Sequence, residues 1–151
     1  MIHALFAGLV FITSAFFALL EIQIEGHSGW ASSLPTWRIE NRWTRAWLGN
    51  RALTGYHFYF HLFMFAVLHA VYVVAPQSFS LATELRILSF LILFWVVEDY
   101  LWFVFNPAYG MGGFTRDRVW WHAATWWGIM PRDYWLFIPA GVLLYIFSWR
   151  L

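Results

Sequence analysis

The chain contains no cysteine and no lysine, and only 11% of its 151 residues are charged. Without cysteine it can form no disulfide, thiolate zinc site, iron–sulfur cluster or covalently attached haem, so histidine and carboxylate are its strong metal ligands. A soluble domain usually has about 25% charged residues, which this chain lacks. Its arginines and acidic residues nearly cancel to a net charge of +1, too weak a field to gather nucleic acid.

Hydrophobic side chains are abundant instead, at 62% of the sequence, and 23% of the residues are aromatic. A membrane-spanning helix needs about 20 mostly apolar residues. Apolar stretches at 2–20, 56–75 and 87–105 predict three spans, and a shorter stretch at 134–149 predicts a fourth. The sequence therefore predicts an all-α integral membrane four-helix bundle in which 1–151 form a single transmembrane domain.

Two segments outside these spans are predicted to lie at the membrane surface. Ile39, Trp43 and Trp47 recur every four residues shortly after Pro35, which predicts an amphipathic interfacial helix at about 36–48. The tryptophan-rich apolar stretch at 119–130 predicts an interfacial or re-entrant helix before the last span. We expect both segments to contact membrane lipids.

The distribution of arginine predicts the orientation of the bundle. Seven arginines lie between spans one and two or between spans three and four, and only Arg86 and Arg150 lie on the opposite side. By the positive-inside rule, both arginine-rich loops are expected in the cytoplasm and both termini outside.

A segment of the first loop carries a resemblance to known sequences. Residues Glu25 to Arg38 follow the pattern Glu-Gly-x-x-Gly-Trp-Ala-x-x-Leu-Pro-Thr-Trp-Arg. In this pattern the segment resembles small bacterial polytopic membrane proteins that have no assigned activity. The resemblance implies no function for the chain, and with the predicted spans it gives the expectation of a bacterial inner-membrane protein.

Ionisable residues of several predicted helices fall at one end of the bundle. His57 and His61 are four residues apart, so both imidazoles project from one helix face and can bind one ion. Glu98 lies at the same level of the third span, and His122 precedes the fourth. Because ionisable groups in a membrane are costly and usually functional, these four residues are predicted metal ligands. Glu25, at the end of the first span, is the candidate catalytic base or a further ligand.

Three function classes remain open from these residues. The first is a metal-dependent membrane enzyme, an oxidoreductase or a hydrolase, in which zinc, iron or manganese acts on a lipophilic small molecule. The second is a b-type haem protein for electron transfer, with His57 or His61 facing His122. The third is a non-catalytic subunit that binds other membrane subunits, in which the same side chains form hydrogen bonds between helices.

Overall fold

The computed structural model describes residues 1–49, 51–75 and 78–151 and is mostly helical. Its long helices are α1 (Ile2–Glu25), α3 (Gly55–His69), α5 (Leu81–Phe105) and α6 (Arg132–Phe147), and α3 continues into α4 (Val71–Val74). Three helical segments are long and apolar enough to cross a membrane, namely Ile2–Glu25, Gly55–Val74 and Leu81–Phe105. The prediction of a helical chain with long apolar helices is thus confirmed, while α6 has only 16 residues.

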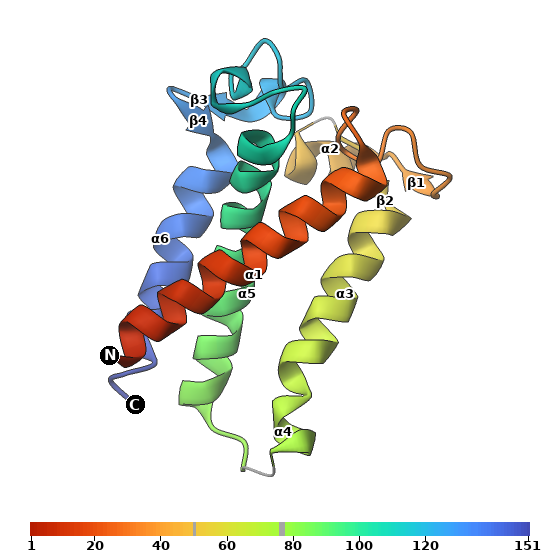
Figure 1. The fold of residues 1–151 in the computed structure, drawn as a ribbon. Helices are drawn as coiled ribbons and strands as arrows, with labels where there is room; N and C mark the ends of the chain where they lie inside the picture. Colours follow the sequence, from red (N-terminus) through yellow and green to blue (C-terminus); the bar gives the residue numbers. More distant parts are fainter. Residues whose placement is uncertain (50, 76–77) are drawn as a thin grey trace.

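The irregular structure of the first and last connections gathers at one end of the helices, and α1 crosses α5 obliquely (Figure 1). Figure 1 shows both termini and α4 at one end of the bundle, and α2 (Arg42–Leu48) with all four short strands at the other. Strand β1 (Arg38–Ile39) pairs antiparallel with β2 (Leu53–Thr54), and β3 (Trp126–Trp127) pairs antiparallel with β4 (Met130–Pro131). We refer to this end as the loop end of the bundle.

Helix α1 packs against α5 along one stripe of residues. The buried residues of α1 recur at intervals of three or four, and they are Val10, Ser14, Ala18, Glu21 and Glu25. That spacing places them all on one helix face. The face that packs onto α5 therefore ends in two carboxyl groups at the loop end.

Small side chains let α5 approach both of its neighbours. The Ser14 hydroxyl donates to the Phe94 carbonyl at 2.9 Å, and the Ser89 hydroxyl donates to the Gly141 carbonyl of α6 at 2.8 Å. A side chain on Gly141 would meet Leu93, because an added Cβ would lie 2.7 Å from Leu93 Cγ. Such small residues at helix crossings are typical of membrane bundles.

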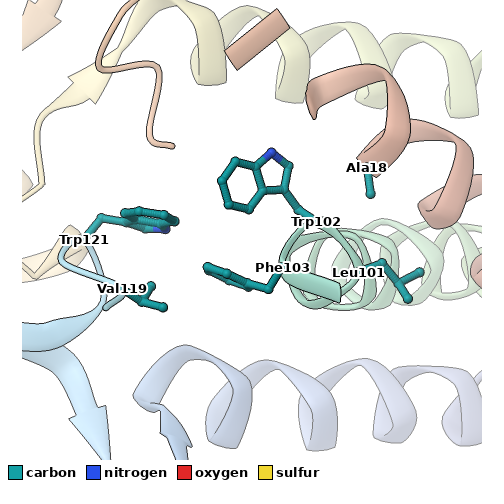
Figure 2. Packing of buried hydrophobic residues seen from close by; sticks show 6 residues of the cluster. All are labelled: Ala18, Leu101, Trp102, Phe103, Val119 and Trp121. Atoms are coloured by element: carbon teal, nitrogen blue, oxygen red, sulfur yellow. The ribbon is translucent and has the colours of Figure 1, made fainter. Parts of the chain in front are cut away.

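An aromatic cluster packs at the loop end of the bundle. Figure 2 shows Trp102 and Phe103 at the end of α5, with Trp121 and Val119 of the following loop approaching from the other side. The rings of Phe103 and Trp121 are stacked, with centroids 5.5 Å apart. This cluster fixes the loop after α5 above the helices.

The structure corrects the predicted helix at 119–130. This segment forms turns, one turn of 3-10 helix at Ala123–Thr125 and the β3–β4 hairpin. Val119 and Trp121 are both buried, yet in an α-helix they would point to opposite sides, about 200° apart. Irregular backbone lets both face inward, and Gly128, with φ of 61°, supplies the turn between the strands.

The predicted helix at 36–48 is also shorter than expected. Arg38 and Ile39 pair with β2 instead, and the helix begins only at Arg42. The Asn41 side chain accepts hydrogen bonds from the amides of Trp43 and Thr44, and the Thr44 hydroxyl accepts one from the Asn41 amide. This reciprocal capping box defines the helix start.

Candidate metal centre

Two carboxyl groups of α1 and one imidazole of α3 meet at the loop end. Potential ligand atoms of Glu21, Glu25 and His57 all lie within 4.8 Å of one another. His57 Nε2 lies 3.9 Å from Glu25 Oε1. Both carboxyl groups are buried, and the His57 side chain is 15% exposed. We call these three residues the Glu–Glu–His group.

The backbone before α3 orients the His57 ring. Thr54 is the N-cap of α3, and its hydroxyl oxygen accepts a hydrogen bond from the His57 amide. The same oxygen lies 2.6 Å from His57 Nδ1. If Nδ1–H donates to Thr54, the lone pair of Nε2 is free to bind a metal, which is the usual arrangement of a ligating histidine.

The loop after α1 folds back over the Glu–Glu–His group. Its Ala31 amide donates to Glu25 Oε1, and the Trp30 ring stacks on the His57 ring with centroids 4.1 Å apart. Trp30 and Ala31 both have φ near +50°, in the left-handed region that non-glycine residues rarely adopt. Backbone strain of this kind concentrates at functional sites.

The Glu–Glu–His group lines a cavity of about 390 Å³. Every residue that the sequence predicted for the site also lines this cavity, and these residues are Glu25, His57, His61, Glu98 and His122. The structure thus brings the predicted residues to one cavity, but it does not gather them around one point.

His61 lies outside the Glu–Glu–His group although it is one turn from His57. It is exposed, its ring stacks on Trp95 at 4.1 Å, and its Nδ1 is 2.7 Å from the His57 carbonyl. The i, i+4 spacing predicted that both imidazoles would face one ion. Instead the α1 carboxyl groups lie next to the first imidazole only.

Glu98 lies deepest among the acidic residues, with an exposed fraction of 3%. It is a neighbour of Glu21 across the α1–α5 contact. Among the residues that the structure describes, its Oε1 has no hydrogen-bond partner. The next residue, Asp99, also lines the cavity.

His122 belongs to a separate polar network on the far side of the cavity. Its Nε2 lies 3.1 Å from Asp99 Oδ2, and its Nδ1 lies 3.3 Å from an Arg51 nitrogen. Arginine only donates, so Nδ1 accepts and Nε2–H donates to Asp99. The Tyr134 hydroxyl also donates to Asp99. With both ring nitrogens in use, His122 is a hydrogen-bonding residue here, and we do not include it among the ligands.

Arg51 is the cation of this network. Its NH2 group donates to Asp133 at 2.9 Å, and its guanidinium stacks over the Trp30 ring. Burial lowers the pKa of Arg51, and the nearby Asp133 carboxylate opposes that shift. An arginine stays charged even so. Arg51 and Asp133 could not be predicted as site residues, because they are 82 residues apart in the chain and no spacing links them. Glu21 could be predicted, because it lies four residues before Glu25, the same spacing as that of His57 and His61.

The three remaining histidines lie away from the cavity. His27 is exposed in the first loop, and His3 bonds the Tyr145 hydroxyl at 2.8 Å near the chain termini. His69 Nε2 lies 2.9 Å from Glu84 Oε1, joining α3 to α5 at the end opposite the loop end. His69 thus has a structural partner, as expected for a histidine that does not join the site.

No protein-family model, curated protein or solved structure matches the chain.

Proposed function

We propose that this protein is a metal-dependent membrane enzyme that acts on a lipophilic substrate. The observation that carries the proposal is the Glu–Glu–His group, whose ligand atoms lie within 4.8 Å of one another at the wall of a cavity. Glu21, Glu25 and His57 would hold the metal. Of the two roles expected for Glu25, catalytic base or further ligand, the proposal takes the ligand.

The charge of the cavity wall supports a bound cation. Five carboxyl groups line the cavity, and Arg51 is the single arginine among the described lining residues. Two unit charges 4 Å apart repel by about 4 kcal/mol at an effective dielectric constant of about 20. A divalent cation between Glu21 and Glu25 replaces that repulsion with attraction. Oxygen and nitrogen ligands without sulfur suit zinc, iron or manganese.

The shape of the cavity supports a lipophilic substrate. Its α5 wall runs from Leu91 to Trp102, which is about 16 Å at a rise of about 1.5 Å per residue. The end toward the bundle centre is apolar, with Leu91, Ile92 and Phe137, whereas the loop end carries the polar groups. An amphiphilic molecule would therefore fit with its polar part beside the metal.

The polar groups of the cavity have distinct roles in this proposal. A bound divalent cation supplies Lewis-acid polarisation of the substrate. Across the cavity, Arg51 holds His122, and His122 and Tyr134 in turn both donate to Asp99. This network would orient the polar part of the substrate against the metal. Within the proposal, the arginine distribution places the site in the cytoplasmic leaflet.

Replacing one histidine on α3 tests the proposal, and a second histidine on the same helix is its control. The detergent-purified protein is expected to contain stoichiometric metal by elemental analysis. The variant His57→Ala should lose it, because one of three ligands and the orienting contact to Thr54 are gone. The variant His69→Ala should keep it, because His69 pairs with Glu84 at the other end. Wild-type protein without metal, or equal metal in both variants, would contradict the proposal.

A second candidate function is a subunit of a larger membrane complex, and one observation favours it. The structure describes all of Gly55–Val74, and no residue is buried in its most apolar stretch of 18 residues. A helix this exposed has room for a partner helix as well as lipid. Copurification of a stoichiometric partner together with absence of metal would support this alternative.

A further inference from the structure

Glu98 has a buried carboxyl oxygen that the Glu–Glu–His group does not use. The residue is 3% exposed, lines the cavity, and has no hydrogen-bond partner for Oε1 within the described part of the chain. Buried polar atoms in native proteins are nearly always paired with protein, water or an ion. The Glu98 carboxyl group lies beside that of Glu21, and a cation in the cavity would give Oε1 a partner.

The surroundings of Glu98 indicate the chemistry of that ligand. Its carboxyl group is a neighbour of Glu21, and the charges of Glu25 and Asp99 also act on it. The Tyr56 hydroxyl is also buried and lies next to Glu21. A site formed by oxygen atoms, most of them acidic, suits a hard divalent cation.

The charge balance leaves room for a second cation. Arg51 and Arg132 both pair with Asp133. With all carboxyl groups ionised and the histidines neutral, the five lining carboxylates against these two arginines leave an excess of three negative charges. One divalent cation at the Glu–Glu–His group would compensate two of these charges and leave negative charge for a second cation.

We infer that Glu98 and Glu21 bind a second divalent cation, of the magnesium or manganese class, next to the cation of the Glu–Glu–His group. This inference rests on the proposed function, because Glu21 belongs to both sites. Such cations are commonly bound through one or two carboxylates and keep several water molecules, so two glutamates suffice as protein ligands. The two together make a two-cation centre between α1, α3 and α5.

Metal counting with manganese tests this inference. The purified protein is stripped with chelator, reloaded with Mn²⁺ alone and desalted, and manganese per chain is measured. We expect two ions in wild type and one in Glu98→Gln, which has nearly the same shape but only a neutral amide. Wild type should also show the electron paramagnetic resonance signal of a coupled manganese pair, and Glu98→Gln the signal of an isolated ion.

A matched control lies on the same helix. Glu84→Gln changes a glutamate of α5 that pairs with His69 away from the cavity, and it should keep two ions. One ion in wild type and in Glu98→Gln would overturn the second site and leave the proposed function standing. No ion in wild type would overturn both. If Glu98→Gln fails to fold, the wild-type count and signal still decide, since one uncoupled ion excludes the centre.

Discussion

The hydroxyl of Thr54 offers the sharpest test of how the fold orients a metal ligand. Thr54 is fully buried, caps α3 and lies 2.6 Å from His57 Nδ1. Thr54→Val keeps the shape of the side chain and removes only its hydrogen bonding. The His57 ring then loses the group that orients it, and its Nδ1 loses its hydrogen-bond partner.

The expected loss can be estimated from comparable sites. Removing a residue that orients a ligating histidine typically lowers metal affinity by about 10- to 100-fold, which corresponds to about 1.4 to 2.8 kcal/mol. Loss of the helix cap lowers the free energy of unfolding by a further amount of about 1 kcal/mol. The affinity is measured by competition with a chelator of known strength.

The chain contains a control for the capping effect alone. The Thr36 hydroxyl accepts a hydrogen bond from the Tyr56 amide at 2.9 Å, in the same first turn of α3. Thr36→Val should lower stability without changing metal affinity, and Thr54→Ser should restore affinity. The reasoning is refuted if Thr54→Val binds metal as tightly as Thr54→Ser, or if Thr36→Val weakens binding equally.

Three further predictions concern stability, pH and topology. Gly49→Ala should lower the melting temperature, because φ of Gly49 is 63° and the new methyl would lie 2.3 Å from Thr125 Cγ2. Gly112→Ala is the control and should leave the melting temperature unchanged, because no atom lies within 4 Å of the new methyl. Equal melting temperatures of the two variants would contradict this prediction. Protons compete with metal for imidazole and carboxylate, so metal occupancy should fall when the protein is acidified to about pH 4, near the ordinary pKa of carboxyl groups. Occupancy that stays constant down to that pH would count against a site of histidine and carboxylate ligands. A reporter fused after Leu151 should be found outside the cytoplasm, and a cytoplasmic reporter would reverse the orientation.

The sequence by itself determined the long apolar helices and which of their residues share a face. In an apolar environment, the N–H and C=O groups of a long apolar stretch find hydrogen-bond partners only within a helix. Three long apolar helices could therefore be predicted from composition and length. The i, i+4 spacing of Glu21 and Glu25 likewise places them on one face whatever they pack against. The structure shows that this face is the buried one.

Only the tertiary structure decided which of these groups meet. The crossing of α1 over α5 brings its carboxyl groups to His57 and leaves His61 at Trp95, and no property of the α3 sequence distinguishes the two histidines. The segment 119–130 has the composition of an interfacial helix, yet burying Val119 and Trp121 together requires non-helical backbone. His122 is held by Arg51 and Asp99, which are distant in the chain. Periodicity describes one element at a time, whereas a site depends on contacts between elements, and those are set by packing.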